Sequence, residues 1–425
     1  MVVLAGGDLV LPNRIASGAS LVIEGARIVA IEPKARIDSP GATVVETPEC
    51  YIVPGFVDVH VHGVDGRDTL DEDDPLTQIA SRLPRYGVTA FCPTTVACAP
   101  GALTHVLTQV GKARAERPVN SARVLPAHLE SNFINPEYRG AQPAECLRLP
   151  LDSADRRAGL PPSREASADH RSLGGVGYGP PIREGDFSAR DILDVIAAAR
   201  PDIGIVTLAP ELPGGVELVR ALVSAGHHVS LGHSGASVDE AMAAIDAGAR
   251  HATHLFNRMA PITHRAPGVA GAVLARNEVA AELICDGYHV HPAMSRIAIA
   301  SKGVGRLMAI TDGTAGSGLA VGSSARLGGR RIHVTEHAAV LDDGTLAGST
   351  LTMDRAFRTI VTAFGFSVTE AATLCSTTPA RELGLTGFGV LVEGAFADVV
   401  VLDRSFRVVR TFIDGREVYR SGAAA

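Results

Sequence analysis

Residues 55–63 read Gly-Phe-Val-Asp-Val-His-Val-His-Gly, and the interpretation of the whole chain starts from this stretch. Its three valines alternate with Asp58, His60 and His62, which is the period of a β-strand. The two histidines therefore point to the same face, where their imidazoles can hold one cation. Two hydrogen-bonded histidines on a half-exposed strand would give the same pattern. Residues at the ends of similar strands decide between these two interpretations.

The composition is typical of an α/β protein, because hydrophobic residues make up 46% of the chain and aromatic residues only 4%. A net charge of −7 without a basic cluster argues against nucleic acid or an anionic membrane as a partner. No apolar run reaches the ~20 residues of a membrane span, and the first residues show no signal-peptide pattern. Six cysteines without Cys-x-x-Cys spacing indicate reduced thiols, so we expect a cytoplasmic protein.

Short strand patterns occur at both ends of the chain. Residues 1–52 and 385–425 contain several of them, and Asp414-Gly415 is a hairpin turn signal. We therefore predict one small β-sandwich domain built from both termini. Between them, residues 53–384 alternate strand and helix patterns, with eight strand candidates counted from Phe56. This alternation predicts a (β/α)₈ barrel of the TIM type.

Residues 147–190 interrupt the alternation. They are rich in proline and glycine, carry mixed charges and contain few apolar residues, so the pattern predicts a long loop. A disordered insertion without a role and a lid over an active site both fit this pattern. The second interpretation rests on position, because the loop follows a strand that carries a candidate ligand.

Polar side chains fall at the carboxyl ends of the predicted strands, where a barrel carries its functional groups. The residues that share this position are His60, His62, Glu130, His233, His254 and Asp312. Four imidazoles and two carboxylates suit Zn²⁺ or a similar divalent ion. A single histidine at a strand end is more often structural, but six such residues in one relative position favour a metal site.

The motifs around these residues resemble the amidohydrolase superfamily and, more narrowly, the N-acetylglucosamine-6-phosphate deacetylase family. The matching segments are residues 54–58, 206–211, 232–234, 253–257, 286–290, 311–313, 344–349 and 378–381. They run through most of the chain except the predicted loop. The resemblance implies a metal-dependent hydrolase that removes the acetyl group from an N-acetylated amino sugar, acting as a homodimer.

By resemblance, the principal metal is held by Glu130, His233 and His254. The pair His60 and His62 is kept by some family members and not by others, and it implies a second ion where it is kept. We therefore expect one or two divalent ions in each chain, with Zn²⁺ as the first choice.

The resemblance also implies roles for residues around the metal. Asp312 matches the general base that takes a proton from the attacking water and delivers it to the leaving amine, which agrees with acid–base chemistry beside a cation. His289 and Arg265 match positions that engage the sugar phosphate, with a dimer interface as one possible source of this contact. Asn257 matches a contact on the phosphate side.

Three departures from the family pattern concern the substrate. Ser131-Asn132 follows Glu130 where the family has Gly-Pro, and Gln142 stands where a histidine polarises the substrate carbonyl. An amide N–H can donate a hydrogen bond but cannot become cationic. Arg258 follows Asn257 where a small residue is usual. These changes keep the metal ligands intact, but they put the identity of the substrate in doubt.

We therefore expect a metal-dependent deacetylase that acts on N-acetylglucosamine 6-phosphate. One alternative keeps the mechanism and changes the substrate to another N-acyl amino sugar, without a phosphate, or to another small amide. A second alternative, from a different class, is a catalytically inactive barrel retained for binding. The intact ligand set and Asp312 argue against this second alternative.

Overall fold

The computed structural model describes residues 1–33, 41–150 and 187–422. Most of the loop predicted at 147–190 therefore lies outside the described residues. Neither interpretation of that loop is tested.

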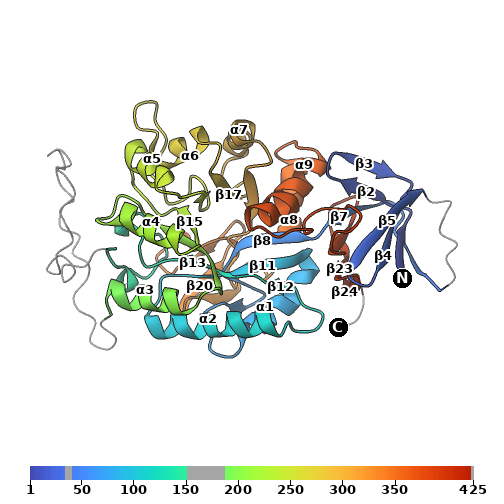
Figure 1. Ribbon diagram of the computed structural model, residues 1–425, viewed down its shortest axis with the longest axis horizontal. Coiled ribbons are helices and arrows are strands. Elements are labelled where there is room, and N and C mark those ends of the chain that lie inside the picture. The colour runs from blue at the N-terminus through green and yellow to red at the C-terminus, as the bar shows by residue number, and fades with distance from the viewer. Residues whose placement is uncertain (34–40, 151–186, 423–425) are drawn as a thin grey trace.

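Within the described residues, eight parallel strands form a nearly closed barrel, which confirms the predicted fold class (Figure 1). In spatial order the strands are β8 (Phe56–Val61), β11 (Val88–Thr95), β13 (Ala127–Glu130), β14 (Ile203–Leu208), β15 (His228–Leu231), β16 (His251–Ala252), β17 (Ala280–Ile284) and β18 (Leu307–Ile310). The short strand β12 (Arg123–Val124) pairs with the first half of β11. Each predicted barrel strand is therefore present.

The barrel closes between its first and last strands. The backbone N–H of Asp312 donates to the carbonyl of His60 at 2.9 Å, and the N–H of His62 donates to the carbonyl of Gly313 at 2.8 Å. The residues that precede these contacts on each side are joined as well, because the Thr311 hydroxyl donates to the buried Asp58 carboxylate at 2.6 Å. The seam of the barrel therefore passes through three of the predicted functional residues.

Helices connect the strands and cover the outside of the barrel. They are α1 (Pro75–Arg82), α2 (Pro100–Ala115), α3 (Ala189–Ala198), α4 (Gly215–Ser224), α5 (Val238–Asp246), α6 (Gly268–Ala275), α7 (Pro292–Lys302), α8 (Met353–Thr362), α9 (Val368–Ala372) and α10 (Thr378–Glu382). Capping boxes begin α3, α5 and α9, where a serine side chain accepts the third N–H of the helix. None of the described helices combines the length and the apolar character that crossing a bilayer requires.

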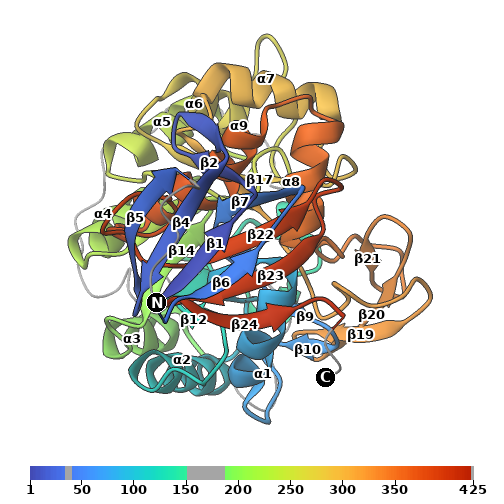
Figure 2. The same ribbon diagram turned by 90° about the vertical axis from the view of Figure 1, so that its right-hand side faces the viewer.

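Both ends of the chain form a β-sandwich beside the barrel (Figure 2). One sheet contains β5 (Arg27–Pro33), β4 (Ala19–Glu24), β1 (Val2–Ala5) and β6 (Thr43–Glu46). The other contains β24 (Arg416–Arg420), β23 (Val408–Ile413), β22 (Val399–Asp403), β7 (Cys50–Pro54), β2 (Asp8–Leu11) and β3 (Arg14–Ser17). Leu4 and Leu21 from the first sheet pack with Ile52 and Phe412 from the second. The domain boundaries themselves stay a prediction.

A three-stranded sheet between β18 and α8 is absent from the sequence-based prediction. It contains β19 (Ser324–Leu327), β20 (Arg330–Val334) and β21 (Ala339–Val340), and it lies beside the hairpin β9 (Gly63–Val64) and β10 (Arg67–Asp68) in Figure 2. Leu327 and Ile332 pack on Val96, and the Arg330 guanidinium donates to the Ala141 carbonyl at 2.8 Å. The sheet therefore reaches the segment next to the predicted site.

Replacing Gly63 with alanine should destabilise the barrel. An added Cβ would collide with the carbonyl of Arg67 and come within 2.9 Å of the Ala315 nitrogen, both of which are backbone atoms. We expect a loss of ~1–3 kcal/mol in the free energy of unfolding, measured by urea denaturation. Gly101→Ala is the matched control, because a Cβ there meets no atom within 4 Å and alanine favours the helix. Equal stability of the two variants would contradict this account.

Candidate metal centre

Glu130, the last residue of β13, converges at the mouth of the barrel with His233 and His254, which follow β15 and β16, as their places in the sequence predict. Glu130 Oε1 lies 2.7 Å from His233 Nε2 and 2.9 Å from His254 Nε2. The two Nε2 atoms are 3.1 Å apart, and all three side chains are buried. Three ligand atoms that face one point in this way form a candidate cation site.

Electrostatics agree with this interpretation. Burial alone would raise the pKa of Glu130, but His233 and His254 hold it well below its ordinary value. Burial alone would lower the pKa of His254, but the hydrogen bond and charge of Glu130 raise it. The carboxylate is therefore ionised and pulls positive charge toward itself. A carboxylate oxygen and two imidazole nitrogens fit a divalent cation such as Zn²⁺.

His60, His62 and Asp312 form a second candidate group beside the first. Asp312 Oδ1 lies 3.3 Å from each of the two Nε2 atoms, which are themselves 3.3 Å apart. Glu130 lies between the groups, because its oxygens are 3.8 Å from His60 Nε2 and 3.6 Å from His62 Nε2. The six side chains expected at strand ends therefore share one buried cluster with room for one or two ions.

Three residues of the cluster have left-handed backbone conformations, which side chains other than glycine rarely adopt. The φ angles are 49° at His233, 29° at His254 and 47° at Asp312. Each residue lies two residues beyond the end of its strand, where the chain leaves the barrel. Strain of this kind is concentrated at functional sites, where the surrounding structure holds it in place.

Glu282 on β17 is a member of the site that sequence reasoning missed. It is completely buried, and its Oε2 accepts from His60 Nδ1 at 2.8 Å and from the His254 backbone N–H at 3.2 Å. Its Oε1 lies 2.9 Å from His251 Nε2. Burial alone would raise the pKa of Glu282, but His60 and His128 hold it well below its ordinary value. A glutamate inside the apolar run 279–285 is the signal that would have revealed it.

Hydrogen bonds behind the imidazoles select which nitrogen faces the cation. Because His60 Nδ1 donates to Glu282, its Nε2 is left free for the metal. His233 Nδ1 likewise donates to the carbonyl of Tyr138 at 2.8 Å. These contacts orient the two rings before any ion binds.

Gln142 lies against the first group of ligands. Its amide nitrogen donates to Glu130 Oε2, and its amide oxygen accepts the backbone N–H of Ala97 at 2.7 Å. The side chain is therefore fixed on both sides and is buried. Gln142 is also one of the residues that line the cavity above the ligands.

A cavity of about 60 Å³ lies above the ligands and is lined by Gln142, Asn257, Arg258 and His289, among others. A space of this size admits an ion and a few waters. His289 Nδ1 donates to Asp286 at 2.6 Å, and its buried Nε2 has no hydrogen-bond partner among the described residues. The free Nε2 belongs to a residue that lines the cavity, which suits a contact with substrate.

Arg258 brings a positive charge to the cavity. Its side chain packs on Gly140, where an added Cβ would lie 2.5 Å from Arg258 Nε, and its Nη2 donates to the Leu346 carbonyl at 3.3 Å. No carboxylate of the described residues forms an ion pair with it. Arg265 is exposed and is not among the residues that line the cavity.

Ser131 and Asn132 hold the segment that follows β13. The Ser131 hydroxyl donates to the carbonyl of Thr207, and the Asn132 amide donates to the carbonyls of Cys98 at 2.8 Å and Cys146 at 2.7 Å. These bonds tie residues 131–146 across the barrel mouth, close to Gln142. The departures from the family pattern therefore lie in one connected layer.

Comparisons with known proteins agree with this geometry. The amidohydrolase family model matches residues 51–418. The chain is 32% identical over 421 residues to N-acetylglucosamine-6-phosphate deacetylase of Bacillus subtilis, with 98% of this chain and 96% of the relative covered. It is also 32% identical over 385 residues to N-acetylgalactosamine-6-phosphate deacetylase of Escherichia coli O157:H7, with 90% and 91% covered. A solved structure from Mycobacterium smegmatis, a variant N-acetyl-D-glucosamine-6-phosphate deacetylase in complex with N-acetyl-D-glucosamine-6-phosphate, has a TM-score of 0.81 at 30% identity and covers 98% and 99%.

Replacing Glu282 with glutamine should weaken metal binding near His60 without unfolding the protein. The amide keeps the shape of the side chain but offers one acceptor in place of two, so His60 loses its charge-assisted bond. We expect a 10–100-fold loss of affinity for the more weakly held ion, of the order typical for such outer contacts. Metal titration followed by elemental analysis measures it.

Two further variants calibrate that measurement. His233→Ala removes a direct ligand and should abolish binding at the first group. Glu278→Gln, which changes a surface ion pair with Arg276, should bind metal like the unchanged protein. Identical metal affinity in Glu282→Gln and Glu278→Gln would refute the positioning role.

Proposed function

Because this chain belongs to the amidohydrolase family, we propose that it hydrolyses the N-acetyl amide of N-acetylglucosamine 6-phosphate to glucosamine 6-phosphate and acetate. The observation that carries this proposal is the convergence of Glu130, His233 and His254 with Asp312 in one buried cluster. The chain is a metal-dependent hydrolase of carbon–nitrogen bonds, and its full-length relatives support the amide of an amino sugar as the bond that is cleaved.

Asp312 is suited to move the proton. Burial alone would raise its pKa, but His60 and His62 hold it below its ordinary value, so the carboxylate is ionised at neutral pH. A divalent cation held by Glu130, His233 and His254 would polarise the amide carbonyl and lower the pKa of the attacking water. Asp312 accepts a proton as the water oxygen bonds to the carbonyl carbon. It returns that proton to the nitrogen as the carbon–nitrogen bond breaks, so acetate and a free amine result.

The substrate phosphate is assigned to the unpaired guanidinium of Arg258, with Asn257 and His289 beside it. An arginine presents a planar fork of donors that suits a phosphate, and this one has no carboxylate partner among the described residues. Arg265 is exposed and lies outside the cavity lining, and the family resemblance implies that it engages a phosphate across a dimer interface. We therefore propose a homodimer, which light scattering would test.

Zinc and a cytoplasmic location complete the proposal. The ligand set of imidazoles and carboxylates suits Zn²⁺, and elemental analysis of protein purified without chelators identifies the ion. The six cysteines are free thiols in the structure, which agrees with a reducing compartment.

A second candidate substrate is N-acetylgalactosamine 6-phosphate. The Escherichia coli relative that carries this name is 32% identical to this chain, the same identity as the glucosamine enzyme of Bacillus subtilis. The two sugars differ only in the configuration of one ring hydroxyl. Acetate release from both phosphorylated sugars and from their unphosphorylated forms separates the candidates, and no release from any of them would leave the inactive-barrel alternative.

Replacing Asp312 with asparagine should lower kcat by ~10²–10⁴-fold, because the amide cannot accept the proton of the water. Metal content should stay within twofold if the residue acts chiefly as a base. Asp343→Asn, in an exposed turn, is the matched control and should keep full activity. A kcat for Asp312→Asn within severalfold of the unchanged enzyme would assign the proton transfer elsewhere.

Replacing Arg258 with glutamine should lower kcat/KM for the phosphorylated sugar by ~10–100-fold, the cost of a lost charge-assisted hydrogen bond. The value for the unphosphorylated sugar should hardly change. Arg265→Gln in the same assay tests the partner contact, and Arg296→Gln on the exposed face of α7 is the control. Equal losses on both substrates would mean that Arg258 does not bind the phosphate.

Replacing Gln142 with histidine should raise kcat for N-acetylglucosamine 6-phosphate. A protonated imidazole polarises a carbonyl more strongly than a neutral amide, roughly twofold in hydrogen-bond strength. Single-turnover measurement separates this chemical step from product release. A lower kcat with unchanged metal content would show that the bonds of Gln142 to Ala97 and Glu130 matter more than the positive charge that a histidine would add.

A further inference from the structure

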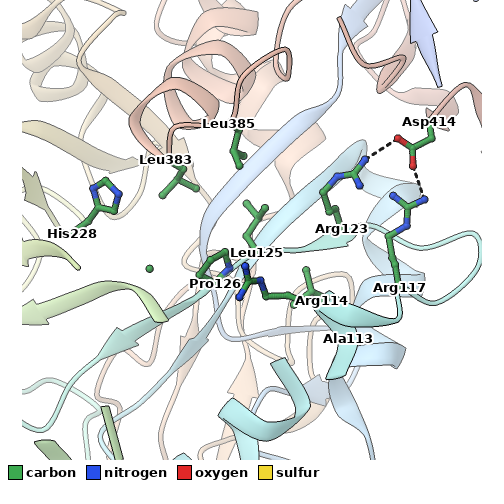
Figure 3. A pocket seen from close by; sticks show the side chains of 12 residues that line it. Ala113, Arg114, Arg117, Arg123, Leu125, Pro126, His228, Leu383, Leu385 and Asp414 are labelled. Carbon is green, nitrogen blue, oxygen red and sulfur yellow. Dashed lines mark hydrogen bonds and ion pairs between the residues drawn. The ribbon is translucent and has the colours of Figure 1, made fainter. Parts of the chain in front are cut away.

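The barrel has a second cavity, of about 610 Å³, at the opposite end from the candidate metal centre (Figure 3). Gly204 and His228 line it from the starts of β14 and β15. The Asp414 carboxylate lies there between two guanidinium groups, 2.6 Å from Arg117 Nη2 and 3.0 Å from Arg123 Nη2. The charges of this cavity are balanced within the protein, so its lining does not indicate a ligand.

The cavity over the metal ligands, by contrast, has one apolar wall. Four aliphatic side chains form this wall, those of Val96, Ala141, Leu327 and Leu346. The rest of the lining consists of the candidate metal ligands, other polar side chains and Gly348. A polar group of a substrate placed against the wall would leave its hydrogen-bonding atoms without partners. The wall therefore indicates the place of an apolar part of the substrate.

The sheet β19–β21 builds most of this wall. Leu327, the last residue of β19, packs with Val96 and Ile332 in one small hydrophobic cluster. Leu346 follows the sheet in the chain and forms a bridge with Val340 of β21. The apolar side of the cavity is thus a product of the segment between β18 and α8, which supplies none of the metal ligands.

The wall is closely packed from behind. Val96 and Leu327 are both buried, and a Cβ added to Gly328 would lie 2.5 Å from Val96 Cγ2. The Arg330 guanidinium donates to the Ala141 carbonyl at 2.8 Å and so ties the sheet to the segment after β13. Side chains packed in this way do not retreat without strain. The wall therefore sets a limit to the size of the group that it contacts.

Both edges of the wall border residues that are assigned to the reacting amide. Ala141 precedes Gln142, whose amide donates to Glu130. At the other edge lies Gly348, where an added Cβ would be 3.6 Å from Asp312 Oδ1. The wall is therefore beside the acyl carbon of the amide that is cleaved. Besides its oxygen and nitrogen, that carbon carries only the alkyl end of the acyl group, which is the apolar part that the wall requires.

We propose that this wall receives the alkyl end of the acyl group and that Leu327 limits it to the single methyl of an acetyl group. The inference rests on the proposed function, because it concerns the acyl group of the same substrate. A propionyl group adds one methylene, which would press on the packed side chain of Leu327. One extra methylene in a hydrophobic pocket changes kcat/KM by about 10–200-fold, so a single leucine can set this preference.

A series of acylated sugars tests the proposal with the full-length enzyme. The substrates are glucosamine 6-phosphate carrying an N-formyl, N-acetyl, N-propionyl or N-butyryl group, and the assay measures glucosamine 6-phosphate, the product that all of them share. We expect kcat/KM for the propionyl substrate to be about 10–200-fold below the acetyl value, and the butyryl value to be lower still. Equal values for acetyl, propionyl and butyryl would overturn the inference alone. No release from any substrate would overturn the proposed function and this inference with it.

Three variants locate the limit. Leu327→Ala should raise the propionyl-to-acetyl ratio of kcat/KM at least about tenfold, a gain that misfolding cannot produce. Ala141→Val adds bulk to the same wall and should lower the acetyl-to-formyl ratio by at least about tenfold. Ile332→Ala is the matched control, because Ile332 belongs to the same cluster but does not line the cavity, and both ratios should stay unchanged. An unchanged propionyl-to-acetyl ratio in Leu327→Ala, or an equal shift in Ile332→Ala, would refute the assignment.

Discussion

The Glu282 carboxylate, buried at the centre of the barrel, is the constraint on which the metal centre depends. A lone carboxylate in such a place is strongly unfavourable, so it must be surrounded by donors. His60, His251 and the backbone N–H of His254 provide them from β8 and from the two ends of β16. The same bonds that compensate the buried charge therefore link three strands and aim an imidazole at the cation. One set of hydrogen bonds therefore both stabilises the barrel interior and orients the metal ligands.

Much of this arrangement could be predicted because strand periodicity and strand ends are local features. The alternation in residues 55–63 was enough to place two histidines on one face, and barrel geometry then brought distant strand ends together. Contacts across the barrel are not local, which is why Glu282 was hidden inside an apolar run. The sheet β19–β21 was missed because its strands are short and only four of their eleven residues are buried. Whether Arg265 reaches a substrate depends on a second chain, which no pattern within one chain specifies.

The departures from the family pattern become intelligible as a connected layer above the metal. Ser131 and Asn132 anchor the segment that follows Glu130, and Gln142 at its far end returns to bond that same carboxylate. A change in this segment therefore acts on the metal ligand and on the substrate together. Arg258 packs against Gly140 of the same segment, and it brings to the cavity a positive charge without a carboxylate partner among the described residues. Substrate choice in this chain is expected to follow from both features jointly.

The closing seam of the barrel also determines when the site can form during synthesis. The bond between Thr311 and Asp58 joins residues 253 positions apart, and the neighbouring backbone bonds of His60 and Asp312 span a similar distance. Contacts between such distant residues form late, because a long loop must close first. A chain still on the ribosome can hold its histidines on β8 long before their partners exist. An ion held by His60, His62 and Asp312 therefore requires the completed barrel, and a chain ending before Asp312 would lack the third ligand of that group.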